Sequence, residues 1–192
     1  MTITTPIAYL LIAAYLLLER WLRKGAQALR LSPGPSDRGS SYVLWIASLL
    51  NFCVFSIAPV LNQHRIASAQ DYRTVGWLGI GLMLLGLGIR YSAAKTLGEF
   101  YTRTLQTFEE QRLVDSGLYR FLRHPGYLGT LLIAVGAGMA MCNWIALAIV
   151  AITELISKLY RIWAEEKMLQ AAFGLAYANY ANNTWRLIPF LY

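Results

Sequence analysis

Charged side chains are scarce in this sequence. Of its 192 residues, 14% are charged and 57% are hydrophobic, with 17 lysines and arginines against 10 acidic residues. A water-soluble domain carries roughly 25% charged residues, so this chain lacks the charge that would cover an ordinary aqueous surface. The composition therefore excludes a typical soluble domain and predicts a surface that faces lipid.

The basic excess has two possible partners. A net charge of +7 would suit a nucleic-acid-binding protein, but the charges here gather in clusters between long uncharged runs, and the apolar fraction is too high for a face that binds a duplex. We therefore expect no nucleic acid partner. Membrane lipids with anionic headgroups are the surface that basic clusters of this kind meet.

Cysteine is scarce as well. Cys53 and Cys142 both lie within apolar stretches, and neither their number nor their spacing supports a disulfide framework or a thiolate metal site. We expect no metal, and we expect both cysteines to pack in the core.

No glycine-rich fingerprint for a dinucleotide follows a predicted strand. Five glycines instead lie within a single apolar run, where we interpret them as positions at which helices pack closely. These glycines are Gly76, Gly79, Gly81, Gly86 and Gly88.

Four uncharged runs organise the chain. Residues 1–18, 39–63 and 74–89 each suit one membrane helix, and the cations that follow the first run, rather than precede it, argue against a cleaved signal peptide. The fourth run, residues 125–153, has 29 uncharged residues, too many for one upright span, and it contains Asn143, which is costly in lipid unless it is buried or lies at a turn. We therefore predict a helical hairpin that turns at Asn143.

The predicted fold class is all-α: one integral-membrane domain over residues 1–192 with five transmembrane helices. Pro59 is expected to kink or end the second helix. The predicted spans are about residues 3–18, 41–61, 74–90, 126–141 and 144–160.

The distribution of lysine and arginine predicts the orientation of these spans. With the N-terminus outside, fifteen of the 17 cations fall in cytoplasmic segments, and Arg65 and Arg73 fall in an external loop. This is a strong positive-inside bias. The polar parts, residues 91–124 and 161–192, then lie on the cytoplasmic face, where we place the active site and the C-terminus. Residues 31–41 form a turn-rich linker to which we assign no chemistry.

A polar motif, residues 117–129, stands at the entry to the fourth run. Because His124 precedes Pro125, a helix that begins at Pro125 places an imidazole at its N-terminus, at the membrane surface. The unpaired backbone N–H groups at that end favour an anionic ligand group, and Gly126 leaves room for a ligand to approach. An interfacial aromatic belt that includes Tyr119 and Tyr127 explains the same residues equally well.

A second polar pair lies beyond the hairpin. Arg161 and Glu165 are four residues apart, so they share a face of one helix. Either they form a surface ion pair of little energetic value, or they offer a cation for a carboxylate and an anion for an ammonium or hydroxyl group. Since the arms of a hairpin are neighbours, His124 and Glu165 can line one pocket, and two polar clusters at one crevice favour a functional site.

Taken together, these residues resemble the isoprenylcysteine carboxyl methyltransferase family and the related integral-membrane phospholipid methyltransferases. The resemblance covers about the last 75 residues well and residues 90–114 loosely. The chain is shorter than the eukaryotic enzymes and so resembles prokaryotic members, which would place it in the plasma or inner membrane. The matching residues are Arg123, His124, Pro125, Gly126, Tyr127, Gly129, Glu165, Glu166, Leu169, Phe173, Gly174, Tyr177, Tyr180 and residues 184–189.

The resemblance implies an S-adenosylmethionine-dependent methyltransferase that acts at the membrane interface on a lipophilic acceptor, above all on the carboxylate of an isoprenylcysteine-like substrate. It implies that Arg161 contacts the substrate, that Arg161 and Glu165 are catalytic, and that the C-terminal segment covers the cofactor pocket. The implied cofactor contacts are Gln111, Arg112, Leu113, Val114, Tyr119, His124, Pro125, Gly126, Tyr127 and Glu165, with Glu166 as the alternative to Glu165.

The acceptor decides how much chemistry the protein must supply. A carboxylate is already deprotonated at neutral pH, so Arg161 would only orient it, whereas an amine acceptor needs Glu165 or Glu166 as a base. Phospholipid amines and small thiols are alternative acceptors. Membrane sterol reductases, which bind NADPH with a similar C-terminal architecture, and a non-catalytic membrane scaffold are further alternatives, and cofactor binding separates the three classes.

Overall fold

The chain folds into helices. The structure, a computed structural model, describes residues 2–22, 37–98, 101 and 113–190. Over these residues it contains no β-strand longer than an isolated bridge, which confirms the predicted all-α class. The elements are α1 (Thr4–Leu22), α2 (Ser40–Gln63), α3 (Tyr72–Leu97), the short 3-10 helix η3 (Gly117–Arg120), α4 (Pro125–Ala140), α5 (Trp144–Phe173) and α6 (Leu175–Asn182).

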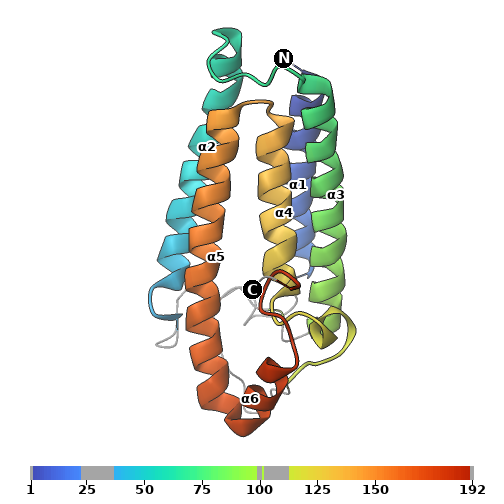
Figure 1. The fold of residues 1–192 in the computed structure, drawn as a ribbon, viewed down its shortest axis with the longest axis vertical. Coiled ribbons are helices and arrows are strands. Elements are labelled where there is room, and N and C mark those ends of the chain that lie inside the picture. The colour runs from blue at the N-terminus through green and yellow to red at the C-terminus, as the bar shows by residue number, and fades with distance from the viewer. Residues whose placement is uncertain (1, 23–36, 99–100, 102–112, 191–192) are drawn as a thin grey trace.

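The first five α-helices run along the long axis of an elongated antiparallel bundle (Figure 1). The N-terminus, the α2–α3 connection and the α4–α5 turn lie at one end, which we call the outer end. The opposite end, which we call the polar end, holds η3, the lower part of α5, α6 and the C-terminal segment. Helix α2 packs mainly on α5, while α4 packs on α3 and α5, so α5 joins the two halves of the bundle.

Within the described part of the chain, three helices are long and apolar enough to cross a membrane by length and composition: α1, α2 and α3. Helix α3 runs seven residues beyond the predicted end of its span, to Leu97, and α2 continues past Pro59 to Gln63. Helix α4 is apolar but has only 16 residues, and α5 carries Glu154 and Lys158 within its apolar part.

The turn of the hairpin lies where the sequence predicts it. Asn143 is 2% exposed and caps α5, where its side-chain oxygen accepts a hydrogen bond from the Ala146 N–H at 3.1 Å. Its amide nitrogen donates to the Asn62 side chain at 2.9 Å and to the Ile66 carbonyl at 2.8 Å. Every polar atom of this asparagine side chain is therefore bonded, which removes the cost of burying it and fastens the α2–α3 connection to the hairpin.

Helices α3 and α4 approach each other through glycine. A Cβ atom on Gly79 would lie 2.5 Å from the Gly136 carbonyl oxygen, and one on Gly86 would lie 2.6 Å from that of Gly129. No larger residue fits such contacts, so the backbones themselves touch. The close-packing interpretation is correct for these two glycines and for Gly76, whose Cβ would meet the Thr4 side chain.

The same interpretation is wrong for two of the five glycines. A Cβ atom on Gly81 or Gly88 would meet nothing within 4 Å, because these glycines lie on the face of α3 that is turned away from its neighbours. Cys53 is a second correction: it is exposed on α2, whereas Cys142 is buried at the outer end as expected. In a run that is apolar on every side, composition does not tell which face packs.

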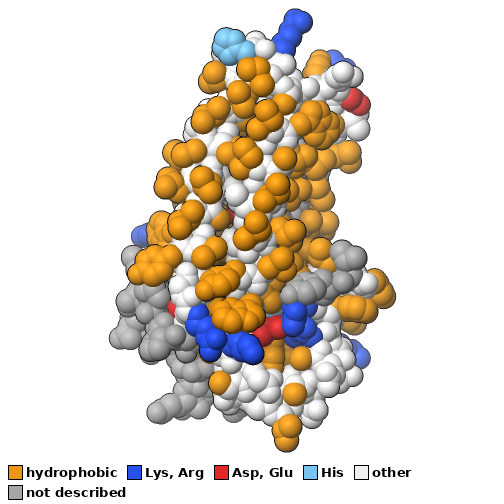
Figure 2. Space-filling view, turned by 60° about the vertical axis from the view of Figure 1, so that its left-hand side comes forward, with side chains coloured by type: hydrophobic (Ala, Val, Ile, Leu, Met, Phe, Trp, Pro, Cys, Tyr) orange, Lys and Arg blue, Asp and Glu red, His pale blue; other side chains and the backbone are white. Residues whose placement is uncertain are grey.

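Large apolar side chains cover the outside of the bundle. Leu49, Phe52, Leu85 and Ile156 are each at least half exposed, at 64%, 70%, 55% and 60%. Figure 2 shows apolar side chains spread over the length of the bundle, with most visible charged side chains gathered toward the polar end. An apolar surface of this extent suits lipid rather than water.

Charged groups inside the bundle are paired. The Arg90 side chain is buried: its Nε donates to Glu19 at 2.6 Å, and Nη1 donates to the Gly126 carbonyl at 3.0 Å. Between α2 and α5, Glu154 accepts a hydrogen bond from Asn51 at 2.8 Å and forms an ion pair with Lys158 at 2.8 Å. Such pairing is what keeps an ionisable group in an apolar bundle.

The glycine contact gives a direct test of the α3–α4 packing. We expect Gly79→Leu to lower the stability of the protein in detergent by about 3 kcal/mol or more, because a side chain at the contact forces the helices apart. Gly81→Leu, two residues along on the outward face, is the matched control and should leave the thermal midpoint within about 2 °C of wild type. Equal effects of the two substitutions would contradict the packing described here.

Candidate functional site

The motif before α4 is held by the C-terminal segment. The Arg123 N–H donates to the Trp185 carbonyl at 2.8 Å, the His124 N–H to the Arg186 carbonyl at 3.2 Å, and the Trp185 N–H to the Phe121 carbonyl at 2.9 Å. These strand-like bonds place residues 184–187 against the start of α4. His124 precedes Pro125, the first residue of the helix, as the sequence predicts.

Four of the predicted site residues meet on the facing sides of α4 and α5. The Tyr127 hydroxyl donates to the Glu165 carboxylate at 2.5 Å, and the His124 ring is stacked on the Tyr127 ring with centroids 5.5 Å apart. His124 Nδ1 lies 3.9 Å from the same Glu165 oxygen. Arg161 Nε donates to the Tyr127 hydroxyl at 3.3 Å, so a single tyrosine links the arginine to the glutamate.

Arg161 is more deeply placed than its position on α5 suggests. It is 2% exposed, and its Nη1 donates to Asp37 at 2.6 Å and to the Ser40 hydroxyl at 2.6 Å. Asp37 lies in the linker, residues 31–41, to which no chemistry is assigned from the sequence, and its carboxylate is the ion-pair partner of Arg161. Asp37 lies two residues before Gly39, the N-cap of α2, and no local sequence pattern pairs it with an arginine 124 residues away.

Glu166 carries a separate set of ion pairs. Its carboxylate lies 2.9 Å from Arg123 Nε, 2.9 Å from Arg186 Nη2 and 3.4 Å from His124 Nε2. Burial by itself raises the pKa of this carboxyl, but the hydrogen bond and charge of His124 and the charges of Arg123 and Arg186 outweigh burial and lower the pKa to about 2. Glu166 therefore joins α5 to the motif and to the C-terminal segment.

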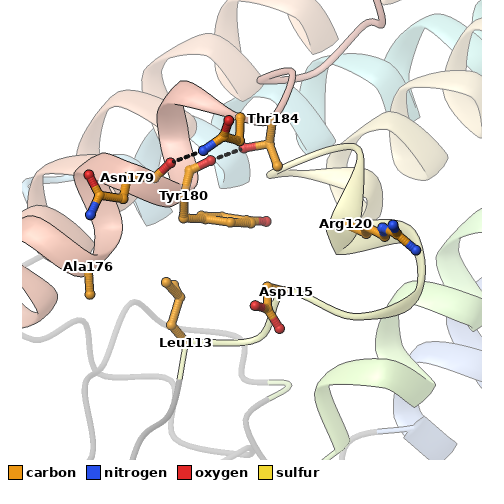
Figure 3. A pocket seen from close by; sticks show the side chains of 8 residues that line it. Leu113, Asp115, Arg120, Ala176, Asn179, Tyr180 and Thr184 are labelled. Carbon is orange, nitrogen blue, oxygen red and sulfur yellow. Dashed lines mark hydrogen bonds between the residues drawn. The ribbon is translucent and has the colours of Figure 1, made fainter.

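An open pocket of about 350 Å³ lies beside this cluster (Figure 3). Leu113, one of the predicted cofactor residues, lines it, and Tyr180 and Thr184 connect it to the motif: the Tyr180 hydroxyl donates to the Tyr119 carbonyl at 2.8 Å, and the Thr184 carbonyl accepts from Arg123 at 2.7 Å. The remaining lining residues are Asp115, Arg120, Ala176, Asn179 and Asn183.

The other predicted cofactor residues fall in different places. Tyr119 is buried on η3, and burial raises the pKa of its hydroxyl far above the usual value. Val114 is half-buried in the segment before η3. Gln111 and Arg112 lie outside the described residues. Thus the structure brings together the part of the predicted site that α4 and α5 carry.

Comparison with known proteins identifies the group to which this arrangement belongs. The profile of the "Isoprenylcysteine carboxyl methyltransferase (ICMT) family" matches residues 78–171. An Arabidopsis thaliana relative, "Protein-S-isoprenylcysteine O-methyltransferase A", is 33% identical over 149 residues, which are 76% of this chain and 72% of the relative. The chain belongs to the isoprenylcysteine carboxyl methyltransferase family.

Two further comparisons define the extent of the family likeness. A rice relative (Oryza sativa subsp. indica), "Probable protein-S-isoprenylcysteine O-methyltransferase", is 35% identical over 126 residues, 64% of this chain, and this chain spans 65% of that relative's length. A solved structure of the "eukaryotic intramembrane Ras methyltransferase ICMT" superposes with a TM-score of 0.64 at 24% identity, covering 77% of this chain and 52% of that one.

The family assignment explains the apolar surface. The fold is that of an isoprenylcysteine carboxyl methyltransferase, and the protein is an integral membrane protein. The segment matched by the family profile contains His124, Tyr127, Arg161 and Glu165, so the cluster built above lies in the shared part of the chain. Asp37 lies outside that segment.

The ion pairs of Glu166 predict a pH dependence of stability. Since the pKa of this carboxyl is lowered in the folded state, its contribution is present above the ordinary carboxyl pKa and is lost as the pH falls toward 2. We expect Glu166→Gln to destabilise the protein by about 1–3 kcal/mol at pH 7. The difference in thermal midpoint between wild type and variant should shrink between pH 6 and pH 3.

The exposed Asp115 provides the control for this measurement. Asp115→Asn should follow the wild-type profile at each pH, because an exposed carboxylate contributes little. A gap between wild type and Glu166→Gln that stays constant down to pH 3 would show that Glu166 is not held ionised by its partners.

Proposed function

We propose that this protein is an S-adenosylmethionine-dependent methyltransferase that methylates the carboxylate of a lipophilic, isoprenylcysteine-like acceptor. The family membership and the printed names of the relatives support this function. The observation that carries it is the chain of contacts from Arg161 through Tyr127 to Glu165, which presents a cation and an anion together where the apolar bundle meets its polar end.

The donor set fits the cofactor. S-adenosylmethionine is a cation at its sulfonium and ammonium groups and also carries ribose hydroxyls and a carboxylate. Glu165 is a carboxylate with 24% of its side chain exposed, whereas the Glu166 carboxylate is held by Arg123, Arg186 and His124. Glu165 is therefore the carboxylate that would contact the cofactor, and the N-terminus of α4 at His124 suits an anionic group.

The residues proposed to hold the cofactor come from three segments. His124, Pro125, Gly126 and Tyr127 lie at the start of α4, and Tyr119 lies on η3 just before it. Leu113, Val114 and the pocket that Leu113 lines extend the proposed binding region toward the C-terminal segment, and Gln111 and Arg112 are proposed from the sequence resemblance alone. At about 350 Å³, this pocket alone is near the lower limit for a small-molecule site.

Methyl transfer requires the protein to align the acceptor with the methyl group of the cofactor, and it requires no nucleophilic side chain or metal. The cofactor supplies a methyl group already activated by the sulfonium. Arg161 orients the acceptor carboxylate, and the Tyr127 hydroxyl, bonded to both Arg161 and Glu165, fixes the distance between the acceptor and cofactor sides of the site. Because a carboxylate acceptor has no proton to lose, Glu165 serves as a binding group and not as a base.

The proposed arrangement in the membrane has five spans within a single domain, with α4 and α5 crossing as a hairpin. The N-terminus lies outside and the polar end is cytoplasmic, so that a soluble cofactor and a lipid-embedded acceptor both reach the same site. Arg65 and Arg73 lie toward the outer end, whereas Arg123, Arg161 and Arg186 gather at the polar end, in line with a positive-inside orientation.

Cofactor binding tests this function first. We expect the detergent-solubilised protein to bind S-adenosylhomocysteine in isothermal titration, and we expect Glu165→Gln and His124→Ala to weaken that binding at least about tenfold, as loss of a charged hydrogen bond would. Lys167→Gln, which removes an exposed charge two residues along α5, is the control and should bind as wild type.

Methyl transfer then tests the acceptor. Arg161→Lys, which keeps a positive charge beside the buried Asp37, should bind S-adenosylhomocysteine within about threefold of wild type but lose methylation of an S-farnesylcysteine derivative by about tenfold or more, because a lysine cannot bind a carboxylate with two parallel hydrogen bonds. Folded protein that binds NADPH instead would favour a reductase, and folded protein that binds neither cofactor would favour a scaffold. Methyl transfer only to amines or thiols would support a methyltransferase but contradict the carboxylate acceptor.

A further inference from the structure

Asp37, which lies just before α2, is completely buried. Its Oδ1 accepts hydrogen bonds from Arg161 Nη1 at 2.6 Å, from the Ser41 hydroxyl at 2.7 Å and from the Ser40 hydroxyl at 3.1 Å. Its Oδ2 accepts one from the Ser41 N–H at 2.9 Å. Four donors thus converge on one carboxylate. Three belong to Ser40 and Ser41, and the fourth belongs to Arg161, which lies 124 residues away in the chain.

These contacts favour the ionised form of Asp37. Burial opposes its ionisation, but the backbone and hydroxyl bonds from Ser41 and the charge of Arg161 outweigh burial and lower the pKa of the carboxyl. The Ser41 N–H belongs to the first turn of α2, so Asp37 also satisfies a helix N-terminus that packing would otherwise leave unpaired. An incoming acceptor would have to replace all four bonds to displace it.

Hydrogen bonds hold both Nη1 and Nε of the Arg161 guanidinium. Nη1 faces Asp37 and Ser40, and Nε faces the Tyr127 hydroxyl. A guanidinium is planar, and its ability to bind a carboxylate depends on the direction of that plane. Hydrogen-bond partners at the start of α2 and on helix α4 hold the plane of this guanidinium in one direction. The flexible arginine side chain alone would not fix that direction.

We propose that Asp37 is a positioning residue that orients Arg161 to receive the carboxylate of the acceptor. The proposal rests on the proposed function, because it needs Arg161 to be the acceptor contact. The proposal adds the start of α2 to the site. Asp37 lies outside residues 78–171, the segment that the family profile matches, and it orients Arg161, which lies inside that segment. Ser40, 2.6 Å from the same nitrogen, supports the orientation.

Steady-state kinetics of methyl transfer to an S-farnesylcysteine derivative provide the first test. Asp37→Asn should raise the KM for the acceptor about tenfold, while kcat and the Kd for S-adenosylhomocysteine stay within about twofold of wild type, since the cofactor side of the site is unchanged. Asp37→Glu should recover part of the loss. Ser40→Ala, which keeps the carboxylate, should raise KM by a smaller factor.

Asp71 provides the matched control. It caps α3 at the outer end, where its carboxylate accepts a hydrogen bond from the Thr74 N–H at 3.1 Å. Asp71→Asn removes the charge of a carboxylate at a helix N-terminus without touching the site, and its KM should equal that of wild type. A role of Asp37 confined to the N-terminus of α2 would leave KM unchanged in both variants, which would overturn the proposal.

A measurement that needs no turnover tests the positioning role of Asp37 independently of the proposed methyltransferase activity. Phenylglyoxal labelling of Arg161, read by mass spectrometry, should be slow in wild type and Asp71→Asn and at least about fivefold faster in Asp37→Asn, because the loss of a buried ionic partner frees the side chain. Equal labelling in folded Asp37→Asn would overturn the positioning role even if the enzyme methylates its acceptor.

The binding preference of the site completes the test. Wild type with S-adenosylhomocysteine should bind S-farnesylcysteine more tightly than its carboxamide, and Asp37→Asn should lose that preference. A lower KM in Asp37→Asn would show that Asp37 competes with the acceptor and would overturn the proposal. A wild type with no carboxylate preference would overturn the proposed acceptor and the positioning role together, whatever the labelling shows.

Discussion

Burial of the Arg161 guanidinium is the constraint on which the polar end of the bundle depends. A charge that is 2% exposed persists in an apolar bundle only when it is paired and hydrogen-bonded. Asp37 brings the opposite charge from the start of α2, Tyr127 brings a hydroxyl from α4, and α5 carries the arginine itself. Three helices therefore have to meet at one point, and the geometry of the site follows from the same requirement that assembles the bundle.

Helix α4 is the element that this arrangement holds most firmly. Glycine contacts fix it against α3, the bonded Asn143 turn ends it at the outer end, and the C-terminal segment together with Arg90 holds its first turn. A site carried by a helix with both ends fixed is more precise than one carried by a loop. The lipid-facing helices can vary in composition, but the residues that touch α4 are confined to narrow choices of size and charge.

The sequence predictions succeeded where a local rule decides the outcome. A proline after His124 begins a helix, an asparagine in a long apolar run marks a turn, and two polar residues four apart share a helical face. The predictions failed for Gly81, Gly88 and Cys53, all of which depend on which side of a helix meets a neighbour. Lipid and packed helices present equally apolar surroundings, so the hydrophobic pattern that orients a helix in a soluble protein is weak here.

By itself, the amino-acid sequence determined the helical class, the apolar runs, the asymmetry of charge between the two ends and the motif that identifies the family. These follow from composition and from interactions within a few residues. Only the tertiary structure decided that Asp37 pairs with Arg161, that Glu166 joins Arg123 to Arg186, and that Glu165 is the carboxylate bonded to Tyr127. The reason is physical: a buried charge takes the partner that helix packing brings within hydrogen-bond distance, and for Arg161 that partner is 124 residues away in the chain.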